Sequence, residues 1–205
     1  MEREPHGARR ILMRAHDAGA SQQELCTDYI AAAAKRLGAR WDDDAISFGD
    51  MALATGRMLA LLRDLRDLAP ATKQRGDREA LFATVPGEQH ILGITMAANL
   101  MRERGWKIDL RVDESISNLC RIAHDNAYQI IGLSAANADR VRTLAAMVVE
   151  LRLAAPHAHI FVGGRLAELE PDIATRLGAD ATAVGFEGSA TALERMYKKL
   201  RIVQH

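Results

Sequence analysis

His90 is the residue of this sequence whose type and surroundings best suit metal binding. It lies in the segment Pro86-Gly87-Glu88-Gln89-His90-Ile91-Leu92-Gly93, two positions after a carboxylate. A neutral imidazole is a common ligand of transition metals, and a carboxylate on its other nitrogen fixes the tautomer and strengthens donation. Glu88 is the candidate for that second role. The alternative is that His90 only caps a helix or hydrogen-bonds a carbonyl group.

Small residues follow several apolar runs farther along the chain. Ser134 ends one run, Gly163 and Gly164 end the next, and Gly185 follows the last. Glycine permits positive φ angles and the close approach of a ligand to the backbone, although glycine pairs are also ordinary turns. These positions become informative only if one fold brings them together.

The rest of the sequence offers little sign of catalysis. His157 and His159 have the pattern of solvated loop histidines, and Cys26 and Cys120 lie on expected helices without metal-ligand spacing. No nucleophile–base pair, dinucleotide fingerprint or phosphate-binding loop is recognisable. We therefore expect a binding protein rather than an enzyme.

The elements that would position the candidate residues alternate beyond residue 75. We expect strands at 81–85, 107–112, 129–133, 159–162 and 181–184, and helices at 90–104, 114–126, 138–153, 166–177 and 189–200. This alternation predicts an α/β fold with a five-stranded parallel sheet of flavodoxin-like (Rossmann-type) order 2-1-3-4-5 and helices on both faces. Ligands of such sheets bind beyond the carboxyl ends of the strands. His90, Ser134, Gly163 and Gly185 would meet at that edge.

The beginning of the chain has a helical pattern instead. Ser21 followed by Glu24 predicts a capping box at the start of a helix that should end near Gly38. Another helix should begin at Ser47 and end before Pro70. Amphipathic helices with short connections of this kind form small bundles.

Composition describes an ordinary soluble chain in two parts, a helical bundle at 1–74 and an α/β domain at 75–205, with a linker at 71–77. Of the 205 residues, 48% are hydrophobic, and 27 basic residues balance 27 acidic ones. No apolar run approaches the roughly 18 residues of a membrane span, the N-terminus lacks the order of a signal peptide, and so few cysteines suit a reducing cytoplasm. We expect a cytoplasmic protein without membrane contact. Without a basic excess, we expect no direct nucleic-acid binding by the chain alone.

The motif around His90 resembles the cobalamin-binding domain of corrinoid proteins, which has the pattern Asp-x-His-x-x-Gly, then Ser-x-Leu, then Gly-Gly. Here the corresponding residues are Glu88-x-His90-x-x-Gly93, Ser134 and the pair at 163–164, and the resemblance covers about residues 79–200. The helical segment before it looks like the cap that shields the upper face of the corrin in that family.

Longer runs narrow the resemblance. Gly-Glu-Gln-His-x-Leu-Gly, Trp-Asp-Asp-Asp-x-x-Ser-Phe and Gly-Ala-Asp-Ala-Thr-Ala resemble the antirepressors of purple photosynthetic bacteria of the AerR/PpaA type. The same group contains relatives that bind haem in a cobalamin-type fold. The resemblance therefore implies a tetrapyrrole-binding regulator.

Residue roles follow from the resemblance. His90 would be the lower axial ligand of cobalt, and Glu88 would hydrogen-bond it. Glutamate stands where aspartate is usual, and its extra methylene predicts a weaker or water-mediated hydrogen bond. Gly93 would leave room for the nucleotide tail, and Ser134 would line the tail pocket. Ala136 departs from the leucine of the family pattern, which leaves that wall of the pocket undefined.

Two further groups complete the implied site. Gly163 and Gly164 would flank the buried benzimidazole, with Gly185 contributing from the loop after the fifth strand. Trp41 would cover the upper face of the corrin, the alternative being a core tryptophan between helices. Cobalamin photoreceptors of the carotenoid-regulator type carry a Glu-His pair ten and eleven residues after this tryptophan, where this chain has Met-Ala. Met51, the first of these, could pack against the ligand or belong to the core.

The resemblance implies a regulator that binds adenosyl- or hydroxo-cobalamin and responds to light, redox state or cobalamin supply. Its expected partner is a transcriptional repressor of photosynthesis genes of the PpsR/CrtJ type. Two alternatives stay open. A haem sensor would keep His90 as the iron ligand, and a corrinoid carrier subunit of a methyltransferase system would have the same two-part build. Glu88 and the Phe48-Gly49-Asp50 segment disfavour the carrier.

Overall fold

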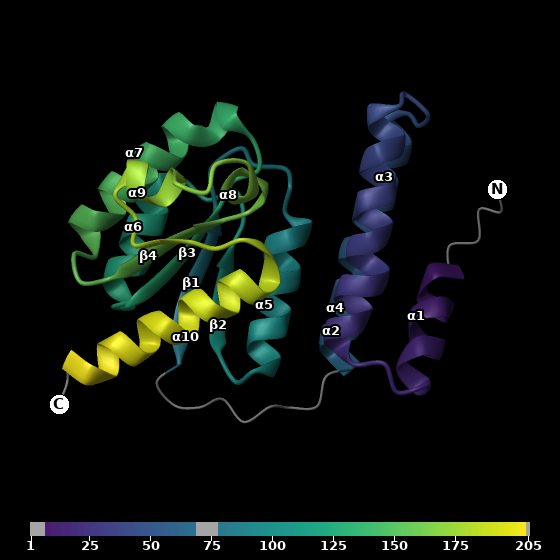
Figure 1. Cartoon of the computed structure of the whole chain (residues 1–205), viewed down its shortest axis with the longest axis horizontal. Helices are drawn as coiled ribbons and strands as arrows, with labels where there is room; N and C mark the ends of the chain where they lie inside the picture. Colours follow the sequence, from purple (N-terminus) through teal and green to yellow (C-terminus); the bar gives the residue numbers. More distant parts are fainter. Residues whose placement is uncertain (1–6, 69–77, 204–205) are drawn as a thin grey trace. The chain divides into compact units, whose positions relative to one another are not determined.

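A computed structural model describes residues 7–68 and 78–203 of the chain, which divides into two compact units, 1–71 and 72–205 (Figure 1). The predicted linker at 71–77, with the predicted domain boundary after residue 74, lies outside the described residues. Among the helices within the described ranges, none combines the length and hydropathy needed to cross a membrane.

The first unit is helical, as predicted. Its elements are α1 (Gly7–Asp17), α2 (Gln22–Glu24), a π-helical segment (Leu25–Ala31), α3 (Ala32–Asp42) and α4 (Phe48–Leu68). The capping box is present, because the Ser21 hydroxyl accepts from the Glu24 N–H at 3.2 Å and the Glu24 carboxylate accepts from the Ser21 N–H at 2.8 Å.

The prediction that a helix ends near Gly38 is wrong. The helix continues to Asp42, so Trp41 lies in its last turn. An interior glycine costs a helix only about 1 kcal/mol relative to alanine, and favourable neighbours outweigh that cost here. The core of the unit contains Leu12, Leu25 and Leu62 among its buried side chains.

The second unit is an all-parallel five-stranded sheet of order β2-β1-β3-β4-β5, which confirms the predicted topology (Figure 1). The strands are β1 (Glu79–Thr84), β2 (Lys107–Arg111), β3 (Ile130–Ser134), β4 (His159–Gly163) and β5 (Ala181–Thr182). The helices are α5 (Leu92–Glu103), α6 (Ile116–Asp125), α7 (Val141–Ala154), α8 (Arg165–Leu169), α9 (Ile173–Leu177) and α10 (Gly185–Val203), with a 3₁₀ turn at Ala138–Arg140.

Both faces of the sheet are covered, because successive side chains of a strand point to opposite faces. In β1, Leu81 and Ala83 belong to the core that contains residues of α6, α7, α8 and α9. Ala80 and Phe82 belong to the other core, with residues of α5 and α10. The sheet therefore lies between two helical layers. The ends of its strands are the part of the sheet that a ligand can reach.

Four predicted elements differ in their bounds from the structure. The predicted helix at 166–177 is two short helices, α8 and α9, with Pro171 between them, because proline lacks the N–H that a continuous helix needs. The fifth strand is only two residues long, and α10 begins at Gly185 rather than at residue 189. Helix α5 begins at Leu92, so His90 precedes it and lies in a loop.

Candidate functional site

His90 and Glu88 form a directly bonded pair in the loop between β1 and α5. The His90 Nδ1 atom lies 2.7 Å from Glu88 Oε1, and the same oxygen accepts from the His90 backbone N–H at 2.8 Å. The expectation of a weaker or water-mediated bond is therefore wrong, because the loop turns the main chain and the ring of His90 toward one carboxylate oxygen. With Nδ1 occupied in this way, Nε2 is the nitrogen left to bind a metal.

The two side chains of the pair differ sharply in exposure. The Glu88 side chain is 2% exposed, whereas the His90 side chain is 61% exposed. A buried carboxylate thus orients an imidazole that reaches outward. This is the arrangement expected of a ligand held ready for a group that arrives from solvent.

Glu88 also joins the His90 loop to the loop after β3. Its second oxygen, Oε2, accepts from the Ala136 backbone N–H at 2.9 Å. Burial raises the pKa of Glu88, but hydrogen bonds from the backbone N–H groups of His90 and Ala136 and from the His90 ring lower it, and the net pKa lies below the usual value. Glu88 is therefore a charged acceptor at neutral pH, and the position where the family pattern has leucine contributes a backbone donor.

Two residues that the sequence did not single out hold the loop from the β2 side. The Gly87 N–H donates to Asp113 Oδ1 at 2.8 Å, and the Asp113 N–H donates to Thr84 Oγ1 at 3.0 Å. Gly87 has φ +74°, a conformation that glycine adopts without strain. Asp113 follows β2 at the same sheet edge, and that position was the one sequence signal that could have revealed it.

The structure brings Ser134 and Gly163 together at the predicted edge. In the strand register, Ser134 lies opposite Thr84 on one side and Gly163 on the other. Gly164 has φ +85°, and a Cβ atom there would lie 2.5 Å from the Ala135 carbonyl oxygen. The loops that follow β3 and β4 pack so closely here that position 164 requires glycine, whether or not a ligand approaches.

Gly93 and Gly185 have different surroundings. Gly93 lies in the first turn of α5, where a Cβ atom would meet nothing within 4 Å. Gly93 is exposed, so this is open surface, and its role beside a ligand group stays a prediction. Gly185 is not in a loop but is the first residue of α10, at φ +64°, and the structure shows no contact that ties it to the His90 pair.

In the helical unit, Trp41 is partly exposed rather than a core residue. Its ring makes an edge-to-face contact with Phe48, with ring centroids 6.4 Å apart and an interplanar angle of 65°. Phe48 is 71% exposed, so the two rings present an apolar surface to solvent. Met51, one turn into α4, is half-buried. Phe48 was not predicted as a site residue, although the sequence places it at the start of the helix after Trp41.

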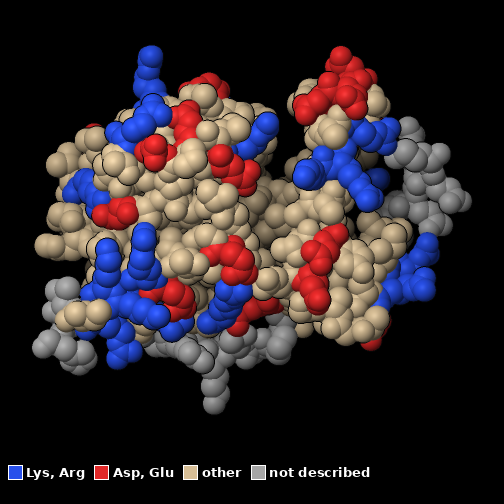
Figure 2. Space-filling model, in the orientation of Figure 1, with Lys and Arg blue, Asp and Glu red and all other residues tan. Residues whose placement is uncertain are grey.

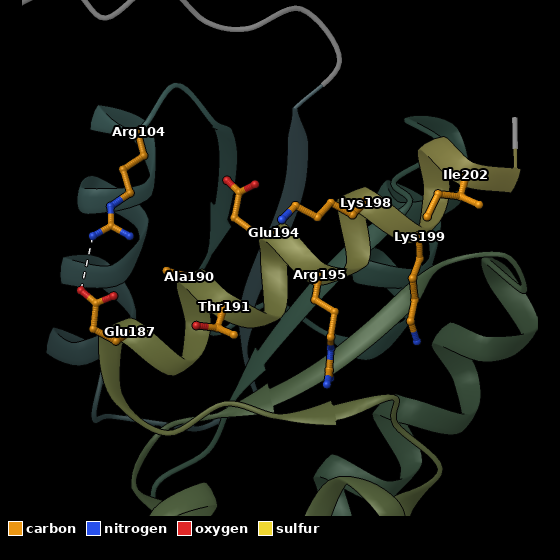
Figure 3. A pocket seen from close by; sticks show the side chains of 9 residues that line it. All are labelled: Arg104, Glu187, Ala190, Thr191, Glu194, Arg195, Lys198, Lys199 and Ile202. Carbon is orange, nitrogen blue, oxygen red and sulfur yellow. Dashed lines mark hydrogen bonds and ion pairs between the residues drawn. The ribbon is translucent and has the colours of Figure 1, made fainter. Parts of the chain in front are cut away.

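A groove of about 490 Å³ lies elsewhere on the α/β unit, along the outer side of α10 (Figure 3). It is lined by Arg104, Glu187, Ala190, Thr191, Glu194, Arg195, Lys198, Lys199 and Ile202. Its carboxylates are engaged, Glu187 with Arg104 at 3.3 Å and Glu194 with Arg78 at 2.7 Å. None of the loops around His90 contributes to it, so it is distinct from the predicted ligand site. Figure 2 shows basic and acidic side chains intermixed on the visible face of this unit.

The donor set around His90 decides which kind of metal fits. Among the residues that the structure describes, no group of three or more His, Cys, Asp or Glu side chains could hold a metal ion. A bare ion such as Zn²⁺ needs three or four protein ligands. A single exposed histidine instead suits a metal whose other ligands come from its own macrocycle, as in a corrin or a haem.

Comparison with known proteins identifies the family to which this site belongs. The family model described as B12 binding domain matches residues 78–194. A Rhodobacter capsulatus protein described as an uncharacterized 20.5 kDa protein in the bchF-crtJ intergenic region is 30% identical over 161 residues, which cover 77% of this chain and 84% of that protein.

Solved structures agree on the fold. The monomethylamine corrinoid protein of Methanosarcina barkeri has a TM-score of 0.75 at 18% identity, covering 90% of this chain and 89% of its own. A cobalamin-binding protein of Desulfitobacterium hafniense has a TM-score of 0.53 at 17% identity, covering 94% and 92%. With a family model that spans more than half of the sequence and the His90 pair at its expected edge, this chain belongs to the B12 binding domain family.

Proposed function

We propose that this protein is a cobalamin-binding regulator that passes the state of its bound cofactor to a transcriptional repressor of photosynthesis genes, of the PpsR/CrtJ type. The observation that carries the proposal is the exposed His90 imidazole, oriented by a buried and charged Glu88 carboxylate. The site supplies one protein ligand, as a corrinoid requires. The described residues around it form no group that could hold a bare metal ion.

The residues of the α/β unit would divide the work of binding. His90 would present Nε2 to the cobalt of the corrinoid, and Glu88 would hold the ring and its tautomer. The nucleotide tail would run past Gly93, where a Cβ atom would meet nothing within 4 Å, and Ser134, Gly163, Gly164 and Gly185 would be its further surroundings. Adenosyl-cobalamin, when bound, would supply a light-sensitive cobalt–carbon bond, so the loaded chain would differ between dark and light.

The exposed aromatic pair of the helical unit supports a covering role. Trp41 and Phe48 present an apolar surface of the kind that excludes water and stacks on a flat ligand. Met51 is half-buried on the same helix as Phe48 and would pack beside them. If this surface covers the face of the corrin opposite His90, water would reach the cobalt there less easily. The group bound on that face would then depend on which cobalamin is bound and on light.

A regulatory role rather than catalysis is supported by two observations. The contacts around His90 serve to position the imidazole, and no nucleophile–base pair is recognisable in the sequence. The Rhodobacter capsulatus relative is encoded between bchF and crtJ, a location consistent with action on photosynthesis gene expression.

The first test is an absorption spectrum of the purified chain after mixing with adenosyl-cobalamin, hydroxo-cobalamin or haemin, in the dark and after illumination. We expect a corrinoid spectrum that survives desalting and changes in His90→Ala. A gel-shift assay of a PpsR/CrtJ-type repressor on its operator DNA should then respond to the loaded chain differently in the dark and in light. A retained haem spectrum without corrinoid retention would replace cobalamin by haem, and an unchanged repressor would refute the regulatory role.

A corrinoid carrier subunit is the second candidate, because the monomethylamine corrinoid protein covers nearly the whole chain. A carrier must alternate between methylated and reduced cobalt while a separate methyltransferase acts on it. If the chain loaded with methyl-cobalamin transfers its methyl group to a thiol acceptor in the presence of such an enzyme, and leaves the repressor unaffected, the carrier assignment replaces the regulator.

A further inference from the structure

Arg140 places a cation directly against the turn that leads into the His90 pair. A Cβ atom built on Gly87 would lie 3.0 Å from Arg140 Nη1 and 3.7 Å from Cζ. The guanidinium therefore occupies the space that a side chain at 87 would take. Arg140 is the last residue of the 3₁₀ turn that follows the β3 loop. Its side chain therefore reaches from the β3 side of the sheet edge to the turn that follows β1.

The Gly87 turn is fixed independently of this contact. Its N–H donates to Asp113 Oδ1, and Glu88 is tied to Ala136. The turn therefore does not need the arginine to close it. A basic side chain on a turn that is already held is not explained by the fold alone.

The hydrogen-bonding capacity of Arg140 is largely unused. Among the described residues its one ion pair is with Asp139 at 3.7 Å, beyond hydrogen-bond distance, and Asp139 is itself 67% exposed. Within the ranges that the structure describes, the guanidinium donates no hydrogen bond. A guanidinium carries five N–H donors in a fixed planar fork, which suits carbonyl and phosphate oxygens. One third of the side chain is exposed at the sheet edge.

We infer that Arg140 is a binding residue for an oxygen acceptor of the corrinoid, which it holds above the Gly87 turn. The inference rests on the proposed function. Cobalamin offers two sources of such oxygens, the carboxamide groups around the corrin ring and the phosphate of the nucleotide tail. Arg140 would thus add affinity from the β3 side of the site while His90 ligates the cobalt from the β1 side.

Titrations with hydroxo-cobalamin and with aquo-cobinamide, which lacks the nucleotide tail, test the inference and separate the two sources. The variants are Arg140→Ala, Arg140→Lys and the control Arg142→Ala, which removes the same charge from an exposed position in the first turn of α7. A hydrogen bond to a charged group corresponds to about a 10- to 100-fold change in affinity. We expect that loss for Arg140→Ala, a smaller loss for Arg140→Lys, and less than about a twofold change for Arg142→Ala.

The pattern across the two ligands identifies the contact. Weaker binding of both corrinoids assigns a carboxamide oxygen, and weaker binding of hydroxo-cobalamin alone assigns the phosphate. The thermal midpoint of the ligand-free Arg140→Ala chain should match that of Arg142→Ala, since a merely structural role would lower it. If Arg140→Ala binds both corrinoids as the control does, the inference is overturned while the proposed function stands. If the unaltered chain binds neither corrinoid, both are overturned.

Discussion

Replacement of Glu88 by alanine should destabilise the α/β unit even without a ligand. The carboxylate accepts from the backbone N–H groups of His90 and Ala136 and from the His90 ring, at 2.7 to 2.9 Å. Each buried N–H that loses its acceptor costs about 1–3 kcal/mol. The Ala136 N–H is buried, whereas the His90 loop is exposed and regains water. We therefore expect the free energy of unfolding to fall by about 3 kcal/mol, the upper end of the range for the one buried group, because the exposed His90 loop adds a smaller loss.

Replacement of Glu88 by glutamine keeps the shape of the side chain and removes its charge, so it separates these two contributions to stability. Its amide has one acceptor oxygen, so at least one of the two loops would face an N–H donor instead of an acceptor. The expected loss is about 1–3 kcal/mol, less than for alanine. Glu168→Ala, at an exposed position of α8, is the matched control and should change stability by less than about 0.5 kcal/mol.

Urea unfolding followed by tryptophan fluorescence measures these differences. Trp106 is 1% exposed in the α/β unit, and a Trp41→Phe background makes it the only tryptophan, so that this unit is observed alone. A change for Glu88→Ala of less than about 1 kcal/mol, or an equal loss for alanine and glutamine, would refute the assignment of the buried hydrogen bonds as stabilising contacts.

Four further predictions concern the same edge of the sheet. His90→Ala should lower the unfolding free energy by about 1 kcal/mol, less than Glu88→Ala, because the 61% exposed ring gives up one hydrogen bond to Glu88 that water can replace. It should also alter the absorption spectrum of bound cobalamin, and an unaltered spectrum would exclude ligation by His90. Gly164→Ala should cost about 2 kcal/mol or more in urea unfolding, since its Cβ would lie 2.5 Å from a carbonyl oxygen. Gly93→Ala should stabilise α5 by about 0.5–1 kcal/mol yet weaken cobalamin binding more than cobinamide binding in titrations, and equal effects on both ligands would place the tail elsewhere. Because hydrogen bonds hold the pKa of Glu88 below its ordinary value of 4.5, its contribution is present above that pH and is lost as the pH falls through the folded-state value. Urea unfolding from pH 7 to pH 3 should therefore show a steeper loss of stability for the unaltered chain than for Glu88→Gln, and parallel curves would contradict this.

The sheet topology could be predicted because buried parallel strands appear as short, continuous apolar runs. The alternation of such runs with helical patterns, together with the handedness of crossovers, leaves few arrangements. Element ends were less accessible. Helix α10 begins at Gly185, with only two residues between it and the end of a two-residue strand, and no local pattern distinguished that start from a loop.

The sequence predicted which residues lie at the candidate site better than it predicted the hydrogen bonds and contacts between them. His90, Ser134 and Gly163 follow strands that the topology brings to one edge. The hydrogen bond from Ala136 to Glu88 joins residues 48 positions apart, and it depends on how two loops approach each other. The same is true of Arg140 against Gly87. Such contacts arise from tertiary packing, which neither spacing nor propensity encodes.

The glutamate at 88 has a use that aspartate would not. Oε1 serves the His90 loop and Oε2 serves the loop after β3, and the extra methylene lets one carboxylate reach both. The carboxylate thus connects the His90 ring to the Ala136 N–H, which lies at the start of the segment that leads through Arg140 into α7.

A physical connection becomes evidence of signalling only when its removal uncouples the two sites. Glu88→Asp should keep the hydrogen bond to His90 and the spectrum of bound cobalamin, and should lose the bond to Ala136. If that bond transmits the state of the cofactor, the repressor should respond to the loaded Glu88→Asp chain equally in the dark and in light. A light response of undiminished size in this variant, with the spectrum intact, would show that the signal leaves the site by another route.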